Sequence, residues 1–182
     1  MKVLSNNILR KIKCHINNNG VIAYPTEYCF GIGCHYKNLH AVQKVIRLKG
    51  RNSTKGMIVI TGNIRHFKLL INIDKDYTTY WPGPNTLLVH SNNRFIRKNV
   101  GGKKNNTIAL RVSSHEIVIQ LCDYLNHALI STSANYSGRF PAKNTKECYR
   151  MFGKKLLVIP GLTNFRRKPS TIINYETKEI LR

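Results

Sequence analysis

Acidic side chains are scarce in this sequence. Its 182 residues include 8 Asp and Glu against 30 Lys and Arg, which gives a formal net charge of +22. So few carboxylates argue against a multi-carboxylate metal cage or a carboxylate-pair active site. The positive charge attracts polyanions, so nucleotides and nucleic acids are the first partners to consider. The alternative is a drift toward Lys and Asn, as in the run Lys103–Asn106, which would raise the charge without a function.

Long apolar runs and paired metal ligands are missing as well. The N-terminus is polar, and no apolar run reaches the length of about 20 residues that a membrane span needs. The five cysteines are scattered without a Cys-x-x-Cys, and the histidines form no His-Glu-x-x-His. These absences argue against a disulfide framework and a structural zinc site. We therefore expect a cytoplasmic protein with reduced thiols, no metal site of its own and no membrane partner.

The motifs of several enzyme classes are absent too. There is no Gly-x-Ser-x-Gly, no P-loop and no Gly-x-Gly-x-x-Gly that opens a helix. The loops carry cations and hydroxyl groups at the predicted ends of strands and helices instead. Such a set suits electrostatic stabilisation of a phosphate-bearing transition state, which needs positioning and positive charge but no covalent intermediate. Composition and spacing thus indicate a nucleotide or nucleic-acid site and go no further.

Short apolar runs alternate with segments of helical spacing along most of the chain. Helices are expected after the caps Ser5 and Asn38, after Ser113 or Ser114, and over Ile64–Ile71 and Lys146–Phe152. Polar, basic Ser91–Asn106 is expected to be a mobile excursion. Strands are expected at Val21–Tyr24, Tyr28–Gly33, Met57–Ile60, Thr86–His90, Thr107–Val112, the start of Ala128–Gly138, Leu156–Pro160 and a closing hairpin over Ser170–Leu181. The alternation predicts a single α/β domain, residues 1–182, with a mixed sheet.

Three features have both a functional and a structural interpretation. The segment Ala128–Gly138 carries four Ser and Thr hydroxyls, an amide and a glycine, which can hold an oxygen-rich ligand or form an ordinary turn. Lys49, Arg51 and Lys55 can clamp phosphates, but cations also suit a helix C-terminus. Arg111 interrupts an apolar run and needs a partner or a ligand.

Several short strings stand out along the chain. They are Tyr24-Pro25-Thr26-Glu27, Phe30-Gly31-Ile32-Gly33, Lys49-Gly50-Arg51, Lys55-Gly56, Trp81-Pro82-Gly83-Pro84, Ala109-Leu110-Arg111-Val112 and Ser131-Thr132-Ser133-Ala134-Asn135-x-Ser137-Gly138. In order and spacing they resemble the motifs of the threonylcarbamoyl-AMP synthases, the YrdC/Sua5 family. From about Ile8 to Arg182 the sequence is similar to the short single-domain bacterial form of that family.

The resemblance implies a fold and a reaction. The fold is a twisted open mixed sheet flanked by helices, with a large basic concave cleft. The reaction joins L-threonine, bicarbonate (or CO₂) and ATP into threonylcarbamoyl-AMP and diphosphate, with Mg²⁺ held mainly by the phosphates. The product serves N6-threonylcarbamoyladenosine formation at position 37 of tRNA. The resemblance therefore also implies tRNA and the threonylcarbamoyl-transfer machinery as partners, and family members bind RNA.

The resemblance also assigns site residues by position. The family's catalytic Lys-x-Arg and Ser-x-Asn pairs fall on Lys49, Arg51, Ser133 and Asn135. ATP is expected at Lys49, Arg51, Lys55, Thr107, Asn135 and Arg182. Threonine is expected at Thr26, Tyr28, Arg111, Ser131, Ser133 and Ser170, with the Arg111 guanidinium on its carboxylate. Tyr28 stands where relatives carry Thr or Ala, and Ile60 stands where some carry histidine.

Two other functions remain open at this point. A non-catalytic module for double-stranded RNA or tRNA would use the net charge and the basic loops Arg94–Lys104 and Arg166–Lys168. Its affinity would fall steeply with salt, and it would not need the Lys-x-Arg and Ser-x-Asn pairs. A related carbamoyl-adenylate enzyme that uses another amine is the third alternative.

Overall fold

A mixed eight-stranded sheet organises the described part of the chain. The computed structural model describes residues 4–50, 56–101 and 106–182. Within these ranges the strand order is β7-β1-β2-β6-β3-β5-β4-β8. The strands are β1 (Ile22–Pro25), β2 (Phe30–His35), β3 (Ile58–Thr61), β4 (Asn85–His90), β5 (Thr107–Val112), β6 (Leu129–Ser133), β7 (Leu157–Val158) and β8 (Thr171–Asn174). The predicted α/β fold with an open mixed sheet is confirmed.

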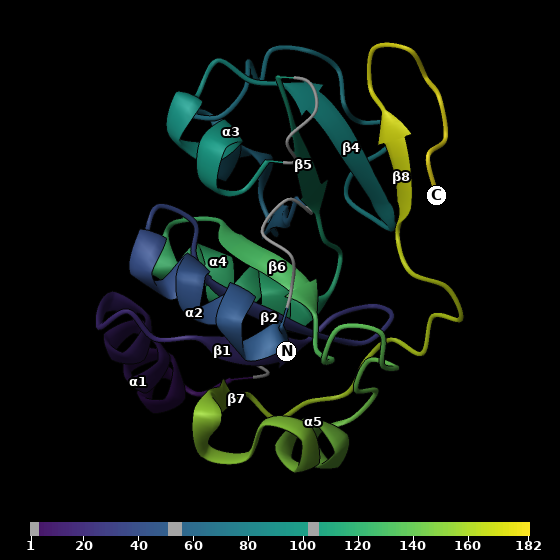
Figure 1. Cartoon of the computed structure of the whole chain (residues 1–182). Coiled ribbons are helices and arrows are strands. Elements are labelled where there is room, and N and C mark those ends of the chain that lie inside the picture. The colour runs from purple at the N-terminus through teal and green to yellow at the C-terminus, as the bar shows by residue number, and fades with distance from the viewer. Residues whose placement is uncertain (1–3, 51–55, 102–105) are drawn as a thin grey trace.

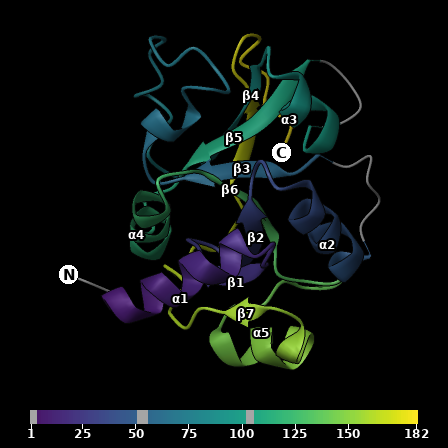
Figure 2. The same ribbon diagram turned by 90° about the vertical axis from the view of Figure 1, so that its left-hand side faces the viewer.

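Five α-helices flank this sheet in the described ranges (Figure 1). They are α1 (Asn6–Asn17), α2 (Leu39–Lys49), α3 (Arg94–Asn99), α4 (Glu116–Leu125) and α5 (Thr145–Phe152). Figure 2 shows α1 and α4 on one face of the sheet and α2 and α3 on the other. Two apolar cores follow from this arrangement, one beneath α1 and α4 and a larger one beneath α2 and α3. None of the described helices combines the length and the apolar character that a bilayer crossing requires.

Polar caps fix where most of these helices begin. The side chains of Ser5, Asn38 and Asn144 each accept a hydrogen bond from a backbone N–H of the first helical turn, as expected for an N-cap. The predicted cap of α4 is wrong, because His115 caps that helix by accepting from the backbone N–H of Ile117 at 3.2 Å. The hydroxyl groups of Ser113 and Ser114 donate instead to the carboxylate of Glu27.

Two further expectations need correction. Only Ile64–Phe67 of the expected helix over residues 64–71 is helical, as a short 3₁₀ turn (η1). The segment expected to be a mobile excursion contains α3, anchored by the fully buried Ile96. Ile96 and Val100, both almost fully buried, and the Asn93 cap hold this helix in an otherwise polar stretch of sequence.

Part of one sheet face has small and polar residues and no described helix over it. Along β5, Ile108 and Leu110 are buried, whereas Thr107 and Ala109 are partly exposed on the opposite face. Ala109 pairs with Ile58 of β3, which pairs with Ser131 of β6, so these three side chains form one row across the sheet. This row lies on the same face as α1 and α4 but beyond the core that they cover.

Candidate functional site

The first cluster of expected site residues lies where β6 ends. Lys49, the last residue of α2, is 3% exposed, and its ammonium group donates to the carbonyl oxygen of Ser133. It also donates to the backbone oxygen of Asn135 at 2.8 Å and to Asn135 Oδ1 at 3.0 Å. Ser133 Oγ donates to the same Oδ1 at 2.6 Å. The end of α2 and the loop after β6 thus form one unit with a positive charge beneath the loop.

This arrangement decides how Lys49 can act. An ammonium group has three donors, and the three oxygens of the loop match them in number. The side chain of Asn135 is fixed in turn, because its Nδ2 donates to the backbone oxygen of Arg139 at 2.6 Å. The loop after β6 thus engages the ammonium group of Lys49.

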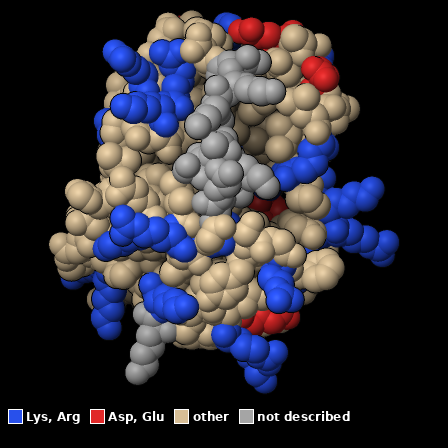
Figure 3. All heavy atoms as spheres, viewed as in Figure 1, with Lys and Arg blue, Asp and Glu red and all other residues tan. Residues whose placement is uncertain are grey.

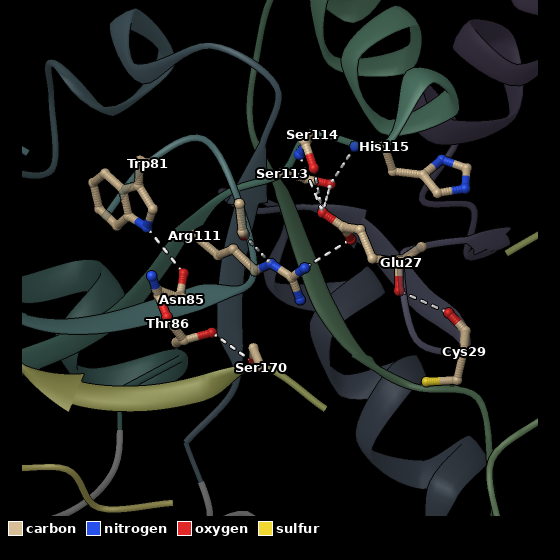
Figure 4. A network of polar contacts seen from close by, with 12 residues as sticks. Glu27, Cys29, Trp81, Asn85, Thr86, Arg111, Ser113, Ser114, His115 and Ser170 are labelled. Atoms are coloured by element: carbon tan, nitrogen blue, oxygen red, sulfur yellow. Dashed lines mark hydrogen bonds and ion pairs between the residues drawn. The ribbon is translucent and has the colours of Figure 1, made fainter. Parts of the chain in front are cut away.

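The second cluster surrounds Arg111, near the C-terminal end of β5 (Figure 4). Its Nη2 lies 2.7 Å from Glu27 Oε2, and its Nε donates to the backbone oxygen of Gly83 at 3.1 Å. Ser113 Oγ donates to Glu27 Oε1 at 2.9 Å, and the backbone N–H of Ser114 donates to the same oxygen at 3.1 Å. The charge that interrupts the apolar run of β5 thus has a buried partner.

Glu27 remains ionised in this setting. Burial by itself raises the pKa of a carboxyl group, and Glu27 is only 5% exposed. The Arg111 charge and the hydrogen bonds from its own backbone N–H, Ser113 and Ser114 outweigh burial, so the pKa lies below its ordinary value. The pair is therefore a carboxylate and a guanidinium at neutral pH.

The third cluster joins the last residue of the chain to β4. Thr86 Oγ1 donates to Ser170 Oγ at 2.8 Å, and Arg182 Nη2 donates to the backbone oxygen of Ser170 at 3.1 Å. Burial lowers the pKa of Arg182, and the nearby charge of Arg111 lowers it further. The terminal arginine thus lies on the Arg111 side of the sheet.

The turn between β1 and β2 connects these clusters. Thr26 Oγ1 donates to the backbone oxygen of Cys29 at 2.7 Å, which holds the turn closed. Lys143 Nζ lies 3.1 Å from the centre of the Tyr28 ring and donates to the Tyr28 backbone oxygen at 2.9 Å. The half-buried ring of Tyr28 is thus held in place by a cation.

Several cations influence the pKa of the Cys29 thiol in this turn. Burial raises the pKa of its thiol to about 11, against the opposing effect of Lys143, Lys49, Arg111 and Arg182. These four cations come from four separate segments of the chain. On the surface, Figure 3 shows Lys and Arg on both halves of the molecule and few Asp or Glu. The large basic cleft stays a prediction.

The remaining expected residues are placed by strand register. Ser131, 8% exposed, belongs to the row that no described helix covers, and Ser133 pairs with Gly31. Thr107 begins β5 on the same face. Ile60 is 2% exposed and packs in the core under α1 and α4. Arg51 and Lys55 lie outside the described residues.

Sequence reasoning missed several members of these clusters. From the sequence, Glu27 stands only within the string Tyr24-Pro25-Thr26-Glu27 with no role of its own, and Lys143 has no predicted role. Ser113 and Ser114 were assigned to a helix cap, although both donate to Glu27. One signal was available, since an acid directly after a buried strand is conspicuous in a chain with 8 Asp and Glu.

Comparisons with known proteins agree with the fold. The family model Sua5_yciO_yrdC, described as Telomere recombination, matches residues 14–182. The Threonylcarbamoyl-AMP synthase of Thiobacillus denitrificans is 40% identical over 176 residues, which cover 94% of this chain and 93% of that protein. The protein of the same name from Buchnera aphidicola is 35% identical over 174 residues, covering 92% and 98%.

Solved structures are similar as well. P. abyssi Sua5 complexed with L-threonine has a TM-score of 0.85 at 24% identity, and the match covers 100% of this chain and 55% of that one. E. coli YciO has a TM-score of 0.83 at 20% identity, covering 98% and 89%. This chain thus spans about half the length of the P. abyssi protein. From the family model and the near-full-length relatives, the chain belongs to the Sua5/YciO/YrdC family.

Proposed function

We propose that this protein is a threonylcarbamoyl-AMP synthase that condenses L-threonine, bicarbonate (or CO₂) and ATP into threonylcarbamoyl-AMP and diphosphate. The observation that carries the proposal is the near-full-length similarity to relatives that bear this name. The clustering of cations and hydroxyl groups around one uncovered sheet face supports it. The non-catalytic RNA module is the weaker alternative, since it has no use for the hydrogen-bonded unit of Lys49, Ser133 and Asn135.

Threonine binds on the Arg111 side of the row. The Arg111 guanidinium takes the carboxylate, since a planar donor fork matches a carboxylate in geometry and charge. Ser131 and Ser133 face the amine and the carbonyl group that forms on it. Thr26, Tyr28 and Ser170 complete the pocket, and the Tyr28 ring, fixed by Lys143, limits its size.

ATP binds on the side where β6 and α2 end. Lys49, together with Arg51 and Lys55, counters the charge of the triphosphate. Asn135, Thr107 and Arg182 hold the nucleotide. The lability of a carbamate in water makes positioning and water exclusion the main tasks of these residues.

The chemistry has two steps. The neutral amine of threonine attacks CO₂, an N–C bond forms, and the nitrogen loses a proton to give a carbamate. A carbamate oxygen then attacks the α-phosphorus in line. The new O–P bond replaces the bond to the β-phosphate, and diphosphate leaves with the electron pair. The cations stabilise the negative charge that develops on the phosphates.

Mg²⁺ belongs to the proposal as a partner of ATP. Among the described residues no group of three or more His, Cys, Asp or Glu could hold a metal ion, and the carboxylate of Glu27 is engaged by Arg111. ATP phosphates are hence its main ligands, and the ion would supply charge neutralisation there. The residues described above perform their tasks of binding and orientation independently of it.

The chemistry of threonylcarbamoyl-AMP indicates which partners act in the next step. A mixed carbamic–phosphoric anhydride is a donor, so we place the protein before an enzyme that transfers the threonylcarbamoyl group to adenosine 37 of tRNA. We place both in the cytoplasm. The net charge of +22 suits a tRNA contact, which would weaken steeply with salt.

The test is a diphosphate-release assay. Purified protein with ATP, bicarbonate, Mg²⁺ and L-threonine should release diphosphate and form the adenylate, detected by mass spectrometry, and omission of threonine should abolish both. Replacing threonine with other amines separates this enzyme from a related carbamoyl-adenylate synthase. Absence of threonine-dependent diphosphate from folded protein would sink the proposal.

A further inference from the structure

Glu27 is the point at which four segments of the chain meet. Its carboxylate contacts Arg111 on β5 and receives two hydrogen bonds from the segment that leads into α4. Its backbone oxygen accepts from the backbone N–H of Arg166 at 3.0 Å. One acidic residue thus ties the β1–β2 turn to β5, to the start of α4 and to the basic loop near residue 166.

The contacts of Arg111 leave one edge of its guanidinium open. Nε is used by Gly83, and Nη2 faces Glu27. Nη1 has no hydrogen-bond partner within residues 4–50, 56–101 and 106–182. Figure 4 shows the third nitrogen of Arg111 pointing away from Glu27, toward the space between Cys29 and Ser170. The two fixed nitrogens therefore determine the direction in which the open edge points.

Glu27 does not reach that space itself. Oε1 is taken by Ser113 and Ser114, and Oε2 is buried against Arg111 with no other donor in the described part of the chain. Its pKa is lowered, so at neutral pH it is a poor proton acceptor. These observations argue against a general base and against a direct contact with substrate.

We propose that Glu27 is the positioning residue for Arg111: it fixes the guanidinium so that the open Nη1 edge faces the carboxylate of the amino-acid substrate. A bidentate contact depends on the plane of the guanidinium, so a tilt of that plane weakens carboxylate binding even though the charge remains. This inference rests on the proposed function.

The central variant is Glu27→Gln, which keeps the shape of the side chain and removes its charge. Its amide can still accept from Ser113 and Ser114 but presents a donor or a neutral oxygen to Arg111. We expect the KM for threonine to rise at least about tenfold, with the KM for ATP changed by less than about threefold. Glu27→Asp keeps the charge and should recover part of the loss. Glu116→Gln, the same change at an exposed position of α4, is the matched control.

A double-variant cycle separates positioning from general support of the fold. If Glu27 acts only through Arg111, Glu27→Gln added to Arg111→Gln should not weaken threonine use beyond Arg111→Gln alone. Thermal unfolding and ATP binding by calorimetry identify variants that fail to fold. If Glu27→Gln is among them, the threonine KM of Glu27→Asp is compared with that of wild type instead.

The outcomes are distinct. An unchanged threonine KM in folded Glu27→Gln, losses for ATP as large as those for threonine, or additive losses in the double variant would each overturn the positioning role while wild-type turnover stands. A wild-type protein without threonine-dependent turnover would overturn the proposed function and this inference with it.

Discussion

Two histidines whose rings contact each other should make the protein less stable in mild acid. His35, at the end of β2, and His127, just before β6, have ring centres 3.8 Å apart. Burial, the neighbouring His127 and Lys37 lower the pKa of His35 from 6.5 to about 4. Burial also lowers the pKa of His127 and the pKa of His66. All three histidines line one cavity of about 840 Å³. The other charged groups that face these rings are Lys13, Arg65, Lys68 and Asp123.

The direction in which stability changes with pH follows from proton uptake by the folded and unfolded states. The unfolded chain protonates the His35 ring near pH 6.5, and the folded chain does so only near pH 4. Between these values the unfolded state binds more protons, so the stabilisation is complete above pH 6.5 and is lost as the pH falls toward 4. The lowered pKa corresponds to at most about 3 kcal/mol. Because the ring is only partly buried, solvent screening reduces this to about 1–2 kcal/mol.

Urea unfolding at several pH values measures this contribution. From pH 7.5 to pH 5, wild type should lose about 1 kcal/mol more free energy of unfolding than His35→Gln, whose glutamine does not titrate. The variant is expected to be less stable at pH 7.5 and to have the flatter pH profile. His40→Gln, at an exposed position of α2, serves as the control and should keep the wild-type slope. Parallel profiles for wild type and His35→Gln would refute the reasoning.

Two further predictions concern the site and the thiols. Lys49→Ala and Ser133→Ala should each lower kcat/KM for diphosphate release at least about a hundredfold with the fold retained by circular dichroism, and near-normal rates in both would remove these residues from the catalytic set. Iodoacetamide at pH 7.5 should modify the exposed Cys14 of the native protein and spare the buried cysteines, whose thiol pKa values burial raises to about 11 or 12. Intact-mass spectrometry measures the adducts, and rapid labelling of Cys29 in a peptide map would contradict its burial.

Local pattern was sufficient for the elements that depend on local rules. The strand Thr107–Val112 was predicted with its observed bounds, because strongly apolar residues fill the run and polar segments flank it. The caps Ser5 and Asn38 were also correct, since a short polar side chain before an apolar helical face has few other uses. The helix expected over residues 64–71 fails because η1 ends at Phe67 and the exposed Leu69 breaks the buried face.

Tertiary contacts decided the parts that local pattern missed. Ser113 and Ser114 have the composition of a helix cap, but the hydroxyl group of Ser113 and the backbone N–H of Ser114 donate to a carboxylate that is 86 and 87 residues away in sequence. His115 then takes over the cap. The same contact explains why Arg111 can interrupt β5, since its partner comes from the β1–β2 turn.

The carboxylate of Glu27 also offsets part of the positive charge around the β1–β2 turn. Lys49, Lys143, Arg111 and Arg182 all act on Cys29, and like charges at such short range oppose one another. Lys49 is compensated by loop oxygens and Lys143 by the Tyr28 ring and its backbone oxygen, whereas Arg111 receives a full negative charge. Arg111 is 6% exposed in the middle of a sheet. A guanidinium there is stable only when paired. In the proposed function, the substrate carboxylate would therefore meet an arginine whose orientation is already set by Glu27 and Gly83.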